Sequence, residues 1–410
     1  MNGMTAFAPL TDASVADLRA RTPGVRTTVH FNHAGASLPS GATLAAVQAH
    51  LEREATMGPM EAGVAAREQT EAARTLAARL LGARPAEIAL TTGNSSGWSG
   101  AFAALGPWRP GDRILVGRHE WGGNIAAMRI AAGRAGASIE AIPSDPSGAV
   151  DARALEDMLD ARVKLIALTW LPANGGLINP AAQVGAVARR HGIPYFVDAA
   201  QAVGQLPIDV AALGCDVLSG AGRKALRGPR GTGLLYVRQD FLHRLTPAVV
   251  DAHSAPLDDE GAPALVDSAA RFEPAETAMA LRCGLAQALR EALDIGLDNI
   301  RARVDRNARA VREQLAGLPG VAVLDQGRER SGLVSFAVVG WEAGAVQAEL
   351  ARGGISISSN GVRYTPLDMQ ARGLKEVARA SVSYLTTDDE IDRLTEAIRA
   401  LCGKGTAGSL

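Results

Sequence analysis

The chain has 410 residues, 47% of them hydrophobic, and its 42 Lys and Arg almost balance 43 Asp and Glu. With a formal net charge of −1, the chain has no excess of positive charge that would attract nucleic acid or an anionic membrane. We therefore expect a small molecule as its partner. The length exceeds the usual size of one hydrophobic core, and we expect two subdomains.

Nothing in the sequence suggests export or membrane insertion. Residues 1–11 show no basic segment followed by an apolar one, and no apolar run is long enough to cross a bilayer. The three cysteines are widely spaced and form no CxxC motif: Cys215, Cys283 and Cys402. This usage suits a reducing compartment, so we predict a cytoplasmic protein. His30 and His33 have no nearby Cys or carboxylate to complete a ligand set, and we expect no metal.

Helical patterns dominate the first 81 residues. Residues 12–21 predict a short helix with Thr11 or Asp12 as its cap, and residues 30–37 predict a strand that leads into a turn of small residues. Residues 44–81 are rich in alanine and predict a helix that Gly58-Pro59 breaks into two pieces.

A strand, a glycine-containing loop and a helix are expected at residues 87–105. Residues 87–92 predict the strand, residues 93–97 read Gly-Asn-Ser-Ser-Gly, and residues 98–105 form an apolar helical stretch. Backbone N–H groups at the start of a helix bind anions, and small hydroxyl side chains add donors. This loop therefore predicts a phosphate site, although simple helix capping by Asn or Ser also explains these residues.

The middle of the chain alternates strands and helices. The expected strands cover residues 113–116, 163–169, 194–198 and 233–238, and the expected helices cover residues 151–160 and 181–190. The strand at residues 163–169 is almost continuously apolar, as in a parallel sheet that is buried on both faces. This alternation predicts a doubly wound sheet.

The last third contains shorter elements. We expect strands at residues 333–339 and 378–384, a helix at residues 343–351, and an amphipathic closing helix at residues 388–401. Residues 251–267 are rich in Pro, Asp and Ala and predict a loop between domains.

Lys224 is the strongest candidate for chemistry. It lies between a glycine-rich turn at residues 219–223 and a loop with glycines at 228, 231 and 233. A lysine held in a narrow, partly desolvated pocket loses its proton more easily, which favours a Schiff base with a carbonyl. Asp198 ends an apolar strand, where a carboxylate can pair with the ring nitrogen of pyridoxal 5'-phosphate (PLP). Taken alone, a lysine flanked by glycines is more often an ordinary solvated side chain.

Together these motifs resemble the class V aminotransferase superfamily of fold-type I PLP enzymes. The resemblance rests on Asp198-Ala199-Ala200-Gln201, on residues 215–220, on Gly222-Arg223-Lys224 and on residues 228–233, and it extends from about residue 31 to residue 394. The superfamily includes cysteine desulfurases, selenocysteine lyases and isopenicillin N epimerase-like proteins. The resemblance implies PLP as the cofactor, a small amino acid as the substrate and a homodimer.

The resemblance also implies a domain layout. The fold would be α/β, with a doubly wound, mostly parallel, seven-stranded sheet in the large domain and a smaller α+β C-terminal domain. Residues 1–30 would pack on the small domain, residues 31–265 would form the large PLP-binding domain, residues 266–402 the small domain, and residues 403–410 a tail.

Within this resemblance, several residues match positions that bind the cofactor phosphate. Asn94 and Ser95 stand where cysteine desulfurases often carry two threonines. Arg223 matches a position often held by histidine and offers a planar fork of donors to phosphate, with a surface arginine as the alternative. Glu276 replaces the threonine through which one subunit contacts its partner's phosphate, so Thr277 is our candidate for that contact.

Other residues match positions around the cofactor ring and the substrate. Trp121 is expected to stack on the ring, with His119 as the second choice and core packing of Trp121 as the alternative. Gln201 is expected at the 3'-oxygen, and Asn174 is a weaker candidate there. Arg379 is expected to bind the substrate α-carboxylate unless it forms a structural ion pair. Gly35 and Ala36 are candidates for backbone approach to the substrate, or for a plain turn.

The reaction type is decided by the step after Lys224 removes the proton from Cα. Cysteine desulfurases need a mobile cysteine shortly before the carboxylate-binding arginine, and residues 353–378 contain none. We therefore favour a β-eliminating C–S lyase that acts on a cysteine-type or S-conjugated amino acid. An aminotransferase and an epimerase, with His33, His119 or Tyr364 as a second acid or base, remain alternatives. From another class, the chain could be a PLP-fold binding protein that has lost activity.

Overall fold

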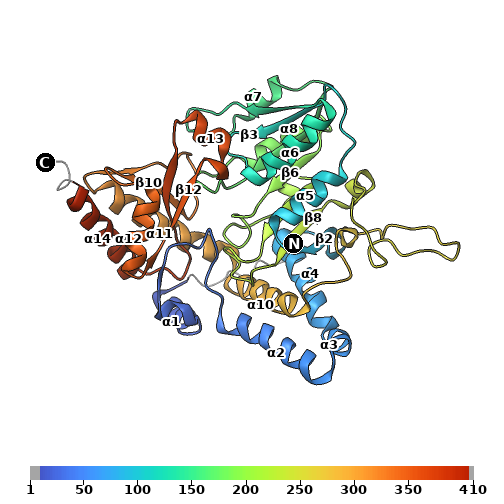
Figure 1. The fold of residues 1–410 in the computed structure, drawn as a ribbon, viewed down its shortest axis with the longest axis horizontal. Helices are drawn as coiled ribbons and strands as arrows, with labels where there is room; N and C mark the ends of the chain where they lie inside the picture. The colour runs from blue at the N-terminus through green and yellow to red at the C-terminus, as the bar shows by residue number, and fades with distance from the viewer. Residues whose placement is uncertain (1–9, 406–410) are drawn as a thin grey trace, which may run out of the picture.

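The computed structural model describes residues 10–405, and within these it consists of a large and a small lobe (Figure 1). The large lobe is built on a seven-stranded sheet in which β8 alone runs antiparallel to its neighbours. In spatial order its strands are β2 (Ile88–Thr91), β8 (Gly233–Val237), β7 (Val217–Ala221), β6 (Tyr195–Asp198), β5 (Val163–Thr169), β3 (Arg113–Gly117) and β4 (Ser138–Ile142). The predicted mostly parallel, seven-stranded sheet is confirmed.

Helices cover both faces of this sheet, because the strands are apolar on both sides. Leu168 and Val197 belong to the core on one face, whereas Ala167 and Phe196 belong to the core on the other. The helices of this part are α2 (Gly41–Met57), α3 (Pro59–Ala65), α4 (Arg67–Leu81), α5 (Asn94–Ala104), α6 (Gly122–Ala135), α7 (Ala152–Asp157), α8 (Ala181–Arg190), α9 (Val210–Leu213) and α10 (Met279–Ile295). No helix in residues 10–405 is long and apolar enough to cross a bilayer.

The small lobe is an α+β unit. Its antiparallel sheet has the order β12 (Ser358–Gly361), β13 (Glu376–Ser381), β10 (Leu333–Val338) and β9 (Val321–Val323). The helices around it are α11 (Leu297–Ala316), α12 (Ala343–Arg352), α13 (Pro366–Ala371) and α14 (Asp388–Gly405). The predicted α+β character of this part is confirmed.

The N-terminal segment contacts the small lobe. Helix α1 (Asp12–Ala20) places Arg19 in an ion pair with Glu390 at 2.9 Å, and β1 (Val29–His30) pairs in parallel with β11 (Ile355–Ser356). Residues 1–9 of the predicted N-terminal segment lie outside the described residues.

Two details differ from the predicted layout. Helix α14 continues to Gly405, so the first residues of the predicted tail are helical, and residues 406–410 lie outside the described part. Glu273, which we assigned to the small domain, accepts a hydrogen bond from the N–H of Leu90 in the large-lobe sheet (2.8 Å). The domain boundaries otherwise stay predictions.

Candidate functional site

A cavity of about 260 Å³ lies at the carboxyl ends of β2, β5, β6 and β7. In doubly wound sheets this edge is where ligands bind, because the connecting loops open there. Seven of the predicted site residues line the cavity together: Asn94, Ser95, Trp121, Asp198, Gln201, Arg223 and Lys224. Residues far apart in the sequence thus line one cavity.

Lys224 lies in the loop after β7, and its Nζ has no hydrogen-bond partner among the described residues. Burial lowers the pKa of Lys224 to about 7; the carboxylate of Asp198 opposes this shift, and the guanidinium groups of Arg223 and Arg379 add to it. Near neutral pH a large fraction of this amine is therefore unprotonated, which is the form that attacks a carbonyl or accepts a proton.

Asp198 lies at the end of β6, buried and held by N–H donors. Its Oδ2 accepts hydrogen bonds from the side-chain amides of Asn94 (3.0 Å) and Asn124 (2.8 Å), and its Oδ1 accepts one from the backbone N–H of Ala200 (2.9 Å). These donors fix the orientation of the carboxylate. The side-chain amide of Asn94 therefore donates to Asp198. If Asn94 contacts the phosphate, its backbone N–H is the donor.

The first turn of α5, which also lines the cavity, has the features of an anion site. The backbone N–H groups of Asn94, Ser95 and Ser96 have no acceptor among residues 10–403. Arg223 reaches the same cavity and forms no ion pair within the described part of the chain. Free N–H groups at a helix start together with a guanidinium suit a phosphate, so the residues present fit PLP at both its nitrogen and its phosphate.

Trp121 is the aromatic side chain that lines the cavity. Its ring centroid lies 5.5 Å from that of Tyr364, with the planes inclined by 48°. His119 is buried outside the cavity wall, and its Nε2 lies 3.1 Å from a carboxylate oxygen of Asp368. Of our two stacking candidates, the geometry favours Trp121.

Arg379, on β13, is buried and has no carboxylate partner among the described residues. Its Nη1 donates to the carbonyl oxygen of Ala173 (2.7 Å), its Nη2 donates to Oδ1 of Asn32 (3.2 Å), and its Nε has no partner in the part of the chain that the structure describes. Burial lowers the pKa of Arg379 to about 10. A guanidinium buried without an acid favours an anionic ligand over the structural ion pair.

The turn that contains Gly35 and Ala36 packs against this region. A Cβ on Gly35 would lie 2.6 Å from Oδ1 of Asn32, the atom that accepts from Arg379. Gln201 donates from Nε2 to the carbonyl oxygen of Ala34 (3.0 Å), so the turn also contacts the cavity wall. The turn is thus held beside both the cavity and the arginine.

Asn174 does not reach the cavity, contrary to our prediction. Its Nδ2 donates to the carbonyl oxygen of Gly361 (3.2 Å), and its Oδ1 accepts from Asn360 (2.9 Å). Both partners belong to β12, so Asn174 connects the two lobes. Its neighbour Ala173 lines the cavity instead.

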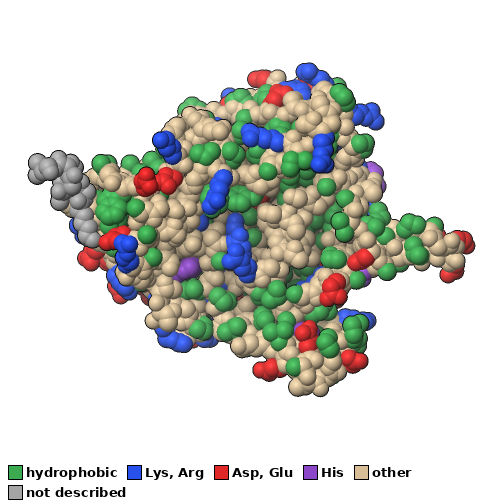
Figure 2. Space-filling view, viewed as in Figure 1, with side chains coloured by type: hydrophobic (Ala, Val, Ile, Leu, Met, Phe, Trp, Pro, Cys, Tyr) green, Lys and Arg blue, Asp and Glu red, His purple; other side chains and the backbone are tan. Residues whose placement is uncertain are grey.

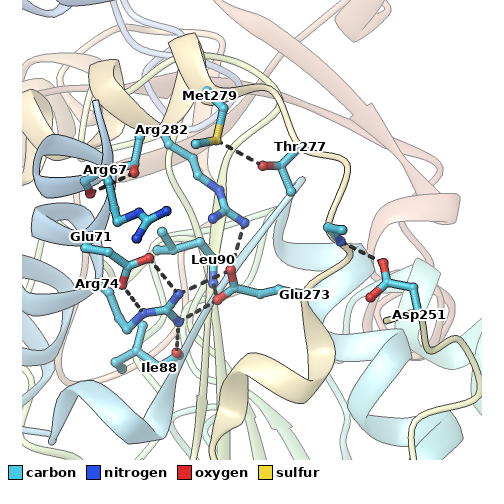
Figure 3. Close-up of polar contacts among 12 residues, drawn as sticks. Arg67, Glu71, Arg74, Ile88, Leu90, Asp251, Glu273, Thr277, Met279 and Arg282 are labelled. Carbon is cyan, nitrogen blue, oxygen red and sulfur yellow. Dashed lines mark hydrogen bonds and ion pairs between the residues drawn. The ribbon is translucent and has the colours of Figure 1, made fainter. Parts of the chain in front are cut away.

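Thr277 also lies outside this cavity and lines a neighbouring one of about 460 Å³, whose walls are mostly apolar. The segment that carries it is anchored by buried Glu273, as Figure 3 shows. Glu273 accepts hydrogen bonds from Arg74 (2.6 Å), Arg282 (2.7 Å) and the N–H of Leu90. Thr277 therefore does not line the cavity of Lys224 in its own chain, although the two cavities share Gly231 and Thr232 in their walls.

No cysteine lines either cavity: Cys215 and Cys283 are buried, and Cys402 is half-buried in α14. Among the described residues no group of three or more His, Cys, Asp or Glu side chains is placed to hold a metal.

Pattern reasoning missed three residues that complete the site. Asn32 bonds Arg379, Asn124 bonds Asp198, and Glu120 lies behind Asn124. Their position in the sequence could have identified them. Polar residues just after the end of a strand or in the first turn of a helix lie at the edge of a doubly wound sheet where ligands bind.

Comparison with known proteins gives a consistent result. The family model "Aminotransferase class-V" matches residues 29–394. A probable cysteine desulfurase of Xylella fastidiosa (strain 9a5c) is 31% identical over 341 residues, which cover 82% of this chain and 81% of that protein. The apo structure of a cysteine desulfurase from Thermococcus onnurineus NA1 superposes with a TM-score of 0.88 at 24% identity, covering 98% of this chain and 100% of that one.

Among the solved structures that match is C-DES, a cystine C–S lyase in complex with its reaction product cysteine persulfide. It has a TM-score of 0.84 at 26% identity and covers 92% of this chain and 99% of that one. A mutant of C-DES with glycine covalently linked to its PLP cofactor has the same TM-score and identity and covers 93% and 98%.

Proposed function

Because this chain belongs to the class-V aminotransferase family and has PLP as its cofactor, we propose that it is a lyase that breaks the Cβ–S bond of a cysteine-type amino acid. The observation that carries the proposal is a cavity lined by Lys224 and Asp198 but by no cysteine, with Arg379 bonded to the carbonyl oxygen of Ala173 in its wall.

When bound, the cofactor supplies an electron sink for the charge left at Cα. Arg379 binds the α-carboxylate of the substrate, and the turn at Gly35 confines it. Lys224, with its lowered pKa, accepts the Cα proton as a general base. Asp198, which Asn94 and Asn124 hold in place, would pair with the ring nitrogen of the cofactor. Trp121, in the cavity wall, would stack on its ring.

The elimination needs no oxidant or reductant, and water is the one further reactant in forming the final products. The electrons of the Cα–H bond form a Cα=Cβ bond, and the sulfur leaves with the electron pair of the Cβ–S bond. After release, the unsaturated amine takes up water and yields pyruvate and ammonia. Cysteine would release sulfide, and a disulfide substrate would release a persulfide.

The Xylella fastidiosa relative is described as a probable cysteine desulfurase, and desulfurase chemistry is the nearest competing proposal. That reaction moves sulfur to a cysteine of the enzyme, and residues 353–378 contain none. The name of C-DES, a cystine C–S lyase, supports elimination. The three free cysteines also fit the cytoplasm, the compartment that we propose.

The test is to incubate the purified holoprotein with L-cysteine and with L-cystine, and to measure pyruvate, sulfide and persulfide. We expect stoichiometric pyruvate from at least one of them, and none from the Lys224→Ala variant. Alanine with a protein-bound persulfide would establish a desulfurase. A keto acid that keeps its side chain, or loss of optical activity without pyruvate, would replace the proposal with an aminotransferase or an epimerase. A protein that binds PLP but converts nothing would favour the inactive binding protein.

We also propose that the active form is a homodimer in which Thr277 of each subunit serves the other subunit's cavity. Support comes from the position of Thr277 away from Lys224 of its own chain and from exposed apolar side chains at Met60, Val64 and Val249. Figure 2 shows hydrophobic side chains on the surface over α2 and α3. Light scattering of the holoprotein should give twice the chain mass of 42.4 kDa. A monomer with full activity would contradict the proposal.

A further inference from the structure

Glu120 is a completely buried carboxylate that the proposed chemistry does not use. It lies between β3 and α6, directly before Trp121, and it does not line the cavity. Burying a carboxylate is costly unless hydrogen bonds compensate, so its partners indicate what it does.

Both oxygens of Glu120 face N–H donors. Its Oε1 accepts from Nδ2 of Asn124 (2.7 Å), and its Oε2 accepts from the backbone N–H of Thr169 (2.7 Å). A protonated carboxyl group would place an O–H against one of these donors, so the surroundings are built for the ionised form.

Asn124 connects this carboxylate to Asp198. Its Nδ2 carries two hydrogens, and one is directed to Glu120 while the other is directed to Oδ2 of Asp198 (2.8 Å). Because both acceptors are carboxylate oxygens, the orientation of the amide is unambiguous. Thr169 adds a second connection, because its Oγ1 accepts from the N–H of Trp121 (2.9 Å) while its own N–H is bound to Glu120.

We propose that Glu120 is a positioning residue that holds Asn124 against Asp198, adds a second negative charge behind Asp198 when ionised, and acts on the cofactor's ring nitrogen through Asn124. Two adjacent carboxylates in a dry site favour a positive charge on whatever group faces them. Burial first, and then the charge of Asp198, raise the pKa of Glu120 to about 7, which reflects the cost of keeping both groups ionised. Tyr195 of β6 is a further titratable group that interacts with Glu120.

The test compares Glu120→Gln with the matched variant Glu87→Gln. Glu87 is also buried and accepts two backbone N–H bonds, from Arg84 (2.9 Å) and Gln239 (3.0 Å), but it lies just before β2, at the end of that strand away from the cavity. The readout is the pH midpoint at which the visible absorption of the bound cofactor changes, measured on holoprotein without substrate. This readout rests on PLP binding and not on the proposed lyase reaction, so the two can fail separately.

We expect the midpoint of Glu120→Gln to fall by about one pH unit, because a negative charge near the cofactor is removed. Glu87→Gln should leave it unchanged. A Glu120→Gln holoprotein whose midpoint equals that of the wild type would overturn the proposal. If Glu120→Gln does not fold, the same pH midpoint is measured on the Glu120→Asp variant. It keeps the charge, so its midpoint should remain within about 0.3 units of the wild type, and a shift as large as one unit would reject the role of the charge.

Discussion

The rings of Trp121 and Tyr364 meet at a centroid distance of 5.5 Å, although Trp121 precedes α6 of the large lobe and Tyr364 lies between β12 and α13 of the small lobe. Trp121, which lines the cavity of the large lobe, therefore packs against a residue of the small lobe. The orientation of the Trp121 ring depends on the relative position of the two lobes.

Replacing Trp121 by Ala should weaken PLP binding about fivefold, because stacking contributes on the order of 1 kcal/mol beyond the buried area. Fluorescence titration with PLP measures this. His119→Gln is the control, since His119 contacts Asp368 and not the cavity. A larger loss of affinity in the histidine variant would reverse our assignment of the stacking residue.

Arg379→Lys should raise KM for the amino-acid substrate about 100-fold while the absorption spectrum of the bound cofactor stays the same. Lysine keeps the charge but cannot present the planar fork that holds a carboxylate in two places. Steady-state kinetics together with the spectrum separate substrate binding from cofactor binding. An unchanged KM would mean that the arginine serves only its contacts with Ala173 and Asn32.

Lys224→Met should stabilise the cofactor-free protein near pH 8 by about 1–3 kcal/mol. The pKa of Lys224 falls from 10.5 to about 7 on folding. Between these values the unfolded chain binds a proton that the folded chain does not, so this group's contribution to stability increases with pH across the window.

The advantage of this variant over the wild type should therefore shrink as the pH approaches 10.5. Urea unfolding at several pH values measures this difference in the free energy of unfolding between Lys224→Met and the wild type. An advantage that does not depend on pH would show that packing, and not proton binding, is responsible.

Glu273→Gln should destabilise the protein by about 3–5 kcal/mol, because it removes the charge that Arg74 and Arg282 share in a buried position. Glu71→Gln removes the exposed partner of the same Arg74 and should cost less than about 1 kcal/mol. Equal losses in the two variants, measured by urea unfolding, would contradict the central role of Glu273.

Sequence patterns predicted the backbone of the site better than its side-chain contacts. The strand Val163–Thr169 and the helix Ala181–Arg190 begin and end where the patterns indicated. In apolar strands and amphipathic helices, the polarity of each residue follows from whether that residue is buried. Helix α7 is shorter than expected, at Ala152–Asp157.

The side-chain contacts depended on neighbours that are distant in the sequence. Lys224 and Asp198 belong to contiguous motifs and were predicted. Asn174 was misplaced because its partner Asn360 lies on another lobe, and Glu120 was missed because its importance arises only when Asn124 connects it to Asp198. A pattern along the chain does not contain such pairs.

The pairing of β1 with β11 has a consequence for the order of assembly during synthesis. Val29 and His30 leave the ribosome about 325 residues before Ile355 and Ser356. The large sheet can fold earlier, as domains do when they emerge in turn. The turn at Gly35, which comes directly after β1, nevertheless has no anchor on the small lobe until β11 is made. A nascent chain that stops short of β11 therefore has Lys224 but lacks the contact of β1 with the small lobe that holds the turn on the substrate side, so this part of the site is completed last.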